Sequence, residues 1–200
     1  MTYSINALGF RKALSRCLIT ASKDRTRPHL HGINFTPVDG RIMLESTDGH
    51  RLTRLHVEAP ESNKGLKGFI ISIDQAKEML ALIPKNTSRG LYISVDGVAF
   101  GIGGNSYVVR PLDYTFPDTD RVIPGKGTFN SMMTFNARYL KEMCETILKD
   151  SDKGDCTTIT ILARAGVDTG PALIMNGNSE DKRVLMPMRV AGDYEEYLAG

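Results

Sequence analysis

The sequence predicts an α+β fold built from three similar units, each with one strand, one helix and three further strands in that order. Two observations carry this prediction: the same order of extended and helical patterns recurs along the 200 residues, and each recurrence holds a single amphipathic helix. One such unit cannot cover both its sheet and its helix. Neighbouring units are therefore expected to merge antiparallel sheets that are backed by the helices.

The first unit runs from about Tyr3 to Ala59 and opens with a short extended stretch. Apolar residues at spacings of three and four then predict a helix over Leu8–Ser22, with Asn6 or Ser4 as its N-cap. Three alternating, turn-bounded stretches predict strands after it. These are Leu30–Thr36, Arg41–Ser46 and Arg51–Val57, with a turn at residues 38–40 between the first two.

The second unit follows a linker at residues 60–67 that is rich in Pro, Gly, Ser and Lys. It begins with a strand over Gly68–Ile73, and Asp74 is the expected N-cap of a helix over Gln75–Ile83 that Pro84 ends. Three further strands complete the repeat. They are expected at Gly90–Val95, Val98–Gly103 and Ser106–Pro111, with a turn at Asp96-Gly97.

The third unit begins near Thr128 with an extended stretch over Ser131–Phe135. Asn136 is the expected N-cap of a helix over Ala137–Lys149. Strands are expected at Thr157–Ala163, Ala172–Asn176 and Arg183–Met188. We therefore expect two domains, residues 1–124 with two units and residues 125–200 with one unit and a C-terminal tail.

Composition places the chain among ordinary folded proteins, since 41% of its residues are hydrophobic and 24% are charged. These values exclude collagen-like, disordered and disulfide-scaffold classes. No apolar run approaches the roughly 20 residues of a membrane span, and the N-terminus lacks the pattern of a secretory signal, so we expect a cytoplasmic protein without membrane partners. The net charge is only +2, so any contact with nucleic acid must come from a local basic face.

The sequence carries no recognisable catalytic or cofactor motif. Cys17, Cys144 and Cys156 are far apart, which favours reduced thiols over disulfides or metal ligands. Four histidines gather between His29 and His56, but no further ligand lies at a spacing typical of zinc. We therefore expect no enzyme, no metal and no cofactor, and a hydrolytic metal site is the enzymatic alternative to test.

Three motifs, in this order, resemble the β sliding clamp of bacterial DNA polymerase III. They are Thr47–Leu52 (TDGHRL), Phe116–Asp118 with Arg121–Pro124 (FPD, RVIP), and Val184–Arg189 (VLMPMR). The resemblance covers about residues 3–190 and implies a DNA-clamp fold. The first two units resemble the family's middle domain and the third resembles the second half of its last domain. No unit resembles the family's first domain, so the usual dimer interface is not expected here.

In that family, a groove between the middle and last domains binds short apolar peptides of polymerases and other replication and repair proteins. The resemblance implies that the same groove exists here. The matching positions are Leu30, Thr47, Gly49, His50, Arg51, Leu52, Pro117, Arg121, Val122, Val184, Leu185, Met186, Pro187 and Met188. Two structural alternatives stay open: Asp48-Gly49 as a simple strand-ending turn, and Val184–Met188 as a buried edge strand.

The resemblance also implies that helices face duplex DNA without reading its sequence. The basic residues on or beside the three helices are Arg11, Lys12, Arg16, Lys23, Lys77, Lys85, Arg138, Lys141 and Lys149. Solvated helix faces explain these charges equally well.

Together these features predict a sliding-clamp-like processivity factor for DNA replication that forms a homo-oligomer. The family ring holds twelve units of this kind, which four copies of this chain would supply. The alternative is an adaptor or decoy that binds clamp-interaction peptides without encircling DNA.

Overall fold

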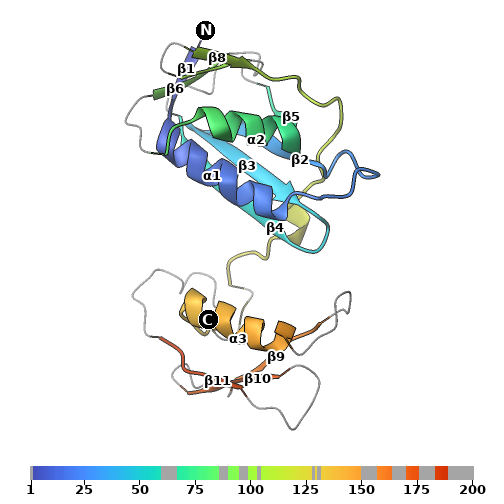
Figure 1. Ribbon diagram of the computed structural model, residues 1–200, viewed down its shortest axis with the longest axis vertical. Coiled ribbons are helices and arrows are strands. Elements are labelled where there is room, and N and C mark those ends of the chain that lie inside the picture. The colour runs from blue at the N-terminus through green and yellow to red at the C-terminus, as the bar shows by residue number, and fades with distance from the viewer. Residues whose placement is uncertain are drawn as a thin grey trace. The chain divides into compact units, whose positions relative to one another are not determined.

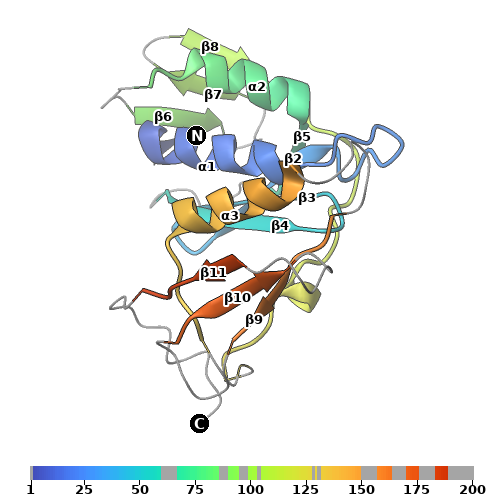
Figure 2. The ribbon, with the colours of Figure 1, turned by 60° about the horizontal axis from the view of Figure 1, so that its bottom comes forward.

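The computed structural model describes residues 2–59, 67–85, 90–94, 99–102, 105–127, 129, 132–149, 157–163, 170–175 and 183–188. The chain divides into two compact units, Met1–Asp118 (unit 1) and Thr119–Gly200 (unit 2). Each unit is described separately (Figures 1 and 2). The turn expected at residues 96–97 and the tail expected at 192–200 lie outside the described residues.

Unit 1 contains two helices and eight strands among its described residues, close to the expected positions (Figure 1). Its elements are β1 (Thr2–Asn6), α1 (Ala7–Thr20), β2 (Gly32–Val38), β3 (Arg41–Thr47), β4 (Leu52–Glu58), β5 (Phe69–Ser72), α2 (Ile73–Leu82), β6 (Gly90–Ser94), β7 (Ala99–Ile102) and β8 (Asn105–Val108). Antiparallel sheets with a few helices confirm the predicted α+β class.

The helix N-termini confirm one predicted cap and correct another. Asn6 caps α1, because its side-chain oxygen accepts a hydrogen bond from the backbone N–H of Gly9 at 2.7 Å. Ser72, not Asp74, caps α2, and its hydroxyl accepts from the N–H of Gln75 at 3.2 Å. Gln75 completes a capping box, and Asp74 lies in the first turn, where its charge favours the helix dipole.

The two repeats of unit 1 exchange their leading strands. One sheet has the order β4-β3-β2-β5, so the first strand of the second repeat joins the sheet of the first. The other has the order β1-β6-β7-β8, which places the first strand of the first repeat in the sheet of the second. The expected merging of sheets thus takes the form of strand exchange between two separate sheets, and it makes each repeat depend on the other.

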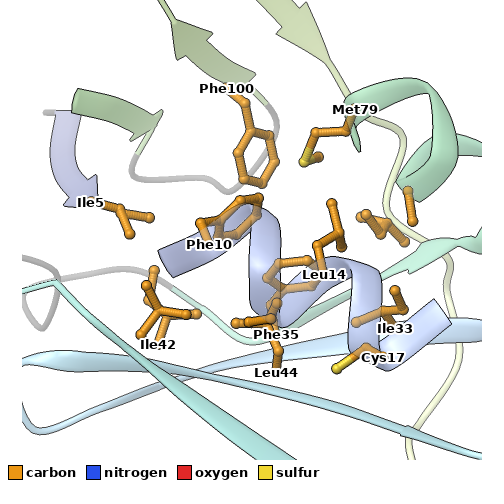
Figure 3. Close-up of a cluster of buried hydrophobic side chains, with 14 of the residues drawn as sticks. Ile5, Phe10, Leu14, Cys17, Ile33, Phe35, Ile42, Leu44, Met79 and Phe100 are labelled. Atoms are coloured by element: carbon orange, nitrogen blue, oxygen red, sulfur yellow. The ribbon is translucent and has the colours of Figure 1, made fainter. Parts of the chain in front are cut away.

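One hydrophobic core joins both sheets and both helices of unit 1 (Figure 3). Four phenylalanine rings lie at its centre: Phe10 from α1, Phe35 from β2, Phe69 from β5 and Phe100 from β7. Phe35 and Phe69 are stacked with centroids 4.9 Å apart, and Phe10 lies within 5.9 Å of Phe35 and 5.8 Å of Phe100. Because these rings come from both repeats, the core forms only when both are folded.

Unit 2 contains a short 3-10 helix, one α-helix and a three-stranded sheet in its described part (Figure 2). Its elements are η1 (Asp120–Val122), α3 (Ala137–Lys149), β9 (Thr160–Leu162), β10 (Ala172–Met175) and β11 (Arg183–Leu185), and the sheet order is β11-β10-β9. Its core is small and is centred on Ile147, Ile174 and Leu185. Residues 132–136, which are the described part of the predicted leading strand, belong to no strand.

Candidate functional site

The β3–β4 hairpin carries a loop at residues 48–51 that is closed by its own side chains. The Asp48 carboxylate accepts hydrogen bonds from the backbone N–H groups of His50 at 3.0 Å and Arg51 at 3.1 Å. Its other oxygen accepts from Arg51 Nε at 2.9 Å. The Thr47 hydroxyl donates to the Arg51 carbonyl at 2.8 Å and accepts from the N–H of Gly49 at 3.1 Å. These contacts hold the loop backbone in one conformation.

Glycine is required in this loop at position 49. Gly49 has φ +92°, a left-handed conformation that side chains with a Cβ rarely adopt. The guanidinium of Arg27 lies over it, 3.6 Å from where a Cβ would stand. His50 and Arg51 are exposed beside it, and Leu52 is half-buried at the start of β4. The loop therefore presents two cationic or polar side chains next to an apolar one.

Hydrogen bonding keeps the Asp48 carboxylate ionised. The N–H of His50 is the largest influence that lowers the pKa of Asp48 below its usual value, and Arg51 contributes through its side chain and its backbone N–H. The loop that follows α1 has a similar device, because hydrogen bonds from Thr26 and Arg27 lower the pKa of Asp24 to about 2. Both loops thus depend on a charged acceptor at neutral pH.

Leu30 is buried in unit 1, so its side chain does not form an open surface. Its N–H donates to the Arg27 carbonyl at 3.0 Å, and its carbonyl accepts from the N–H of Ser22 at 3.1 Å. Leu30 therefore anchors the loop whose Arg27 reaches Gly49. Pro117, near the end of unit 1, is exposed.

The end of β11 presents an apolar row in unit 2. Val184, Met186 and Met188 are 57%, 60% and 47% exposed, and they alternate along the chain with residues that are more buried. Leu185 is buried against Ile174 in the core of the unit, which fixes the strand beneath the row. Val122 and Arg121, on η1, are also exposed, and Pro187 is half-buried. Exposed apolar side chains in such a row are typical of a binding surface.

Most of the predicted DNA-facing cations lie on solvent. Lys12, Arg16 and Lys23 of the α1 segment are exposed, as are Lys77 and Lys85 of the α2 segment. The two helices pack against each other, so these cations share one helical layer of unit 1 (Figure 1). On α3, the cations Arg138, Lys141 and Lys149 are exposed, although Lys141 lies 3.3 Å from Glu145.

Arg11 differs from the other cations of this set. Its guanidinium donates to the backbone carbonyls of Leu80 and Ile83 at the C-terminal end of α2. It therefore satisfies carbonyls that a helix end leaves unpaired and holds the two helices together. The sequence suggested only its charge, since the contact joins residues that are far apart along the chain.

A buried carboxylate is the feature that sequence reasoning missed. Glu45 of β3 is buried, accepts from Arg54 Nε at 2.7 Å and accepts from the Asn34 amide at 3.2 Å. The sequence signal for this burial was a single acidic residue within a predicted strand whose other residues are buried or half-buried. Asn34 belongs to β2 and Arg54 to β4, so the Glu45 carboxylate links three neighbouring strands. It therefore contributes to their register beside the hairpin loop.

Neither a metal site nor a membrane span occurs in the part of the chain that the structure describes. No three His, Cys, Asp or Glu side chains come together there, and none of its helices is long and apolar enough to cross a bilayer. Burial raises the pKa of the Cys17 thiol to about 11, so this cysteine is neutral. Cys144 is a free thiol, and Cys156 lies outside the described residues.

We expect the Asp48 carboxyl to titrate below 3.8, its ordinary value, in an NMR pH titration. Because the folded pKa is lowered, the contribution of Asp48 to stability is complete above that ordinary value and is lost as pH falls through the folded pKa. Asp48→Ala should lower the free energy of unfolding by about 1 kcal/mol at neutral pH and reduce this acid dependence. The exposed Asp113→Ala is the matched control. A midpoint at or above the ordinary value would contradict the ordered loop.

Known proteins are similar to this chain in sequence. Residues 4–118 match the family model described as the DNA polymerase III beta subunit, central domain. The beta sliding clamp of Rickettsia felis is 28% identical over 151 residues, which are 73% of this chain and 39% of that protein. That of Streptococcus pneumoniae serotype 4 is 25% identical over 159 residues, 78% of this chain and 41% of that protein. The chain thus spans about two fifths of the length of these relatives.

Solved clamps have the same fold at low identity. The crystal structure of the DNA polymerase sliding clamp from Pseudomonas aeruginosa with ligand matches with a TM-score of 0.78 and 19% identity, over 96% of this chain and 52% of that one. The Bacillus subtilis clamp matches with a TM-score of 0.75 and 18% identity, over 93% of this chain and 48% of that one. The family match covers more than half of the chain and confirms the resemblance that the three motifs indicated. The chain therefore belongs to the family of DNA polymerase III beta subunits, the beta sliding clamps.

Proposed function

We propose that this chain is a non-catalytic, processivity-factor-like clamp that binds short apolar peptides of DNA polymerase and other replication proteins and holds them on duplex DNA. Its membership in the sliding-clamp family supports this proposal. The observation that carries the peptide-binding part is the exposed row of Val184, Met186 and Met188, which lies in β11 and directly after it and is held from beneath by the buried Leu185.

Each unit offers its own proposed peptide-contacting residues: this row with the exposed Arg121 and Val122 in unit 2, and the 48–51 loop with the exposed Pro117 in unit 1. Methionine side chains are flexible and polarisable, so they can adapt to several apolar anchors. Leu30 and Leu185, both buried, have a supporting role and hold the backbone beneath the surface. Burial of two or three anchors at roughly 1.5–3 kcal/mol each, less the cost of ordering the peptide, gives affinity on the order of micromolar.

The proposed DNA-facing surface is the exposed basic face of α1, together with Lys77 and Lys85 of the α2 segment. On α2, Lys77 lies 4.0 Å from Asp74. α1 carries Arg11, Lys12 and Arg16 and no carboxylate. Contacts between such cations and phosphates are independent of sequence and are screened by salt, which suits a protein that slides. Arg11 leaves this set, because its guanidinium already binds the carbonyls of α2.

The peptide surface is tested with the double variant Leu52→Ala/Met186→Ala. We expect it to weaken binding of a fluorescent peptide with Leu and Phe anchors by at least about tenfold, as measured by fluorescence anisotropy, because two apolar contacts are removed. Val108→Ala, which alters an exposed apolar residue of β8, should leave binding unchanged. Equal affinity of the double variant and the unchanged protein would contradict the proposed surface.

The second candidate function is an adaptor that binds these peptides without encircling DNA. The net charge of only +2 favours it, because the chain as a whole attracts phosphates weakly. Retention on nicked circular and linearised plasmid separates the two functions. An encircling assembly stays on circles at raised salt and is lost from linear DNA, whereas an adaptor is retained on neither.

The same assay tests the basic face. We expect Lys12→Glu/Arg16→Glu to reduce retention on circular DNA and to weaken its dependence on salt, since two phosphate contacts become repulsive. Lys67→Glu, an exposed change away from both helices, is the control. Unaltered retention of the double variant would contradict the assignment of α1 to DNA.

A further inference from the structure

Both sheets of unit 1 are completed in the same way by a strand from the other repeat. The residue that caps one helix pairs with the glycine that begins the strand after the other helix. Asn6, the cap of α1, pairs with Gly90 of β6, and Ser72, the cap of α2, pairs with Gly32 of β2. The exchanged strand thus always adds beside β2 or β6, the strand that directly follows a helix. This rule states where the missing strand of the third repeat belongs.

Residues 133–136 are the counterpart of β5 in the third repeat. Asn136 precedes α3 and accepts from the N–H of Arg138 at 2.9 Å, just as Ser72 precedes and caps α2. The carbonyl of Thr134 accepts a hydrogen bond from the N–H of Met188 at 2.7 Å. Ile70 precedes α2 by the same number of residues as Thr134 precedes α3, and its carbonyl accepts from the N–H of Leu112 at 2.8 Å. Residues 133–136 therefore hold the same position before a helix as the exchanged strand β5, but they pair with no strand among the described residues.

The receiving position is the outer edge of β9, the strand that directly follows α3. Ile161 faces the buried Ile174 across the sheet and so lies on the core side, yet it is 42% exposed. The core-side residues of β2, Ile33 and Phe35, are fully buried because β5 covers their outer edge. Within the described residues, nothing covers the corresponding edge of β9.

The helix of unit 2 shows the same incomplete burial. α1 buries six residues, packs against α2 and shares its core, whereas Ile147 is the buried residue of α3 in its described surroundings. Tyr139 and Leu148 of α3 are exposed. A second helix and a fourth strand would cover these side chains, as they do in unit 1.

The chemistry of the β9 edge favours pairing rather than solvent. Edge strands that stay free are usually protected by Lys, Pro or a bulge. Residues 157–163 (TTITILA) contain no charge and no proline, and residues 131–136 (SMMTFN) contain none either. Segment and edge are thus both neutral and rich in apolar or β-branched residues.

We propose that two copies of this chain exchange residues 133–136, each adding this segment as a fourth strand to the β9 edge of the other. The third repeats of the two copies then form the same strand-exchanged pair of sheets that the two repeats of unit 1 form within one chain. Such an exchange is two-fold symmetric and closed, because each copy gives one strand and receives one. In unit 1 each cap lies opposite the first residue of the receiving strand, Ser72 opposite Gly32 and Asn6 opposite Gly90. Because β9 begins at Thr160, the same register places Asn136 opposite Thr160 and Phe135 opposite Ile161.

Light scattering of the full chain over a concentration series tests this interface. We expect the unchanged protein to reach the mass of two chains or an even multiple. Ile161→Lys places a charge on the core side of the edge and should raise the dissociation constant of the dimer at least about tenfold. Ile19→Lys, the same change at an exposed residue of α1, should leave it unchanged.

A second variant makes the test specific to the exchange. Phe135→Glu alone should weaken the dimer, and Ile161→Lys/Phe135→Glu should restore it, because the two charges face each other only between copies. Far-UV circular dichroism establishes that each variant is folded. A monomer at all concentrations, an unchanged dimer in Ile161→Lys, or no restoration in the double variant would each overturn the proposal. Peptide binding uses other residues, so its outcome is independent.

Discussion

The exchange of leading strands is the constraint on which the structure depends. β1 completes the sheet of the second repeat and β5 completes the sheet of the first, so neither sheet can be finished by one repeat alone. The stacked rings of Phe35 and Phe69 lie on either side of this exchange, on strands β2 and β5. Unit 1 is therefore a single cooperative core even though its sequence reads as two repeats.

This constraint also positions the candidate functional surfaces of unit 1. Because the two sheets share one core, α1 and α2 pack side by side, and Arg11 ties them together through the carbonyls of Leu80 and Ile83. The exposed cations of both helices then form one layer. The hairpin loop at residues 48–51 is ordered separately, by Asp48 and Thr47, at the end of β3 and β4.

Periodicity and turn residues predicted most elements, since these signals are local. Apolar spacing, cap residues and Pro84 located the three helices, and Asp39-Gly40, both with positive φ, marked a hairpin turn. Local signals could not choose between Ser72 and Asp74 as the cap of α2, because both residue types favour that position. They also could not show which strand completes which sheet, because β3 and β4 separate β2 from β5 in the sequence.

The candidate site was predictable in kind rather than in detail. The motifs indicated the loop and the row at residues 184–188, and alternation along a strand accounts for the exposure of Met186 and the burial of Leu185. The contact of Arg11 with α2 and the burial of Glu45 depend on residues distant in sequence. No pattern along the chain encodes such contacts.

Differential scanning calorimetry of the full chain over a range of protein concentrations tests the central claim most directly. Strand exchange within unit 1 and between copies in unit 2 predicts two transitions. That of unit 1 should be two-state and independent of concentration, and that of unit 2 should rise in temperature with concentration, because its fold is completed by association. A unit 2 transition that does not move with concentration, or a unit 1 that unfolds in two steps, would contradict the account.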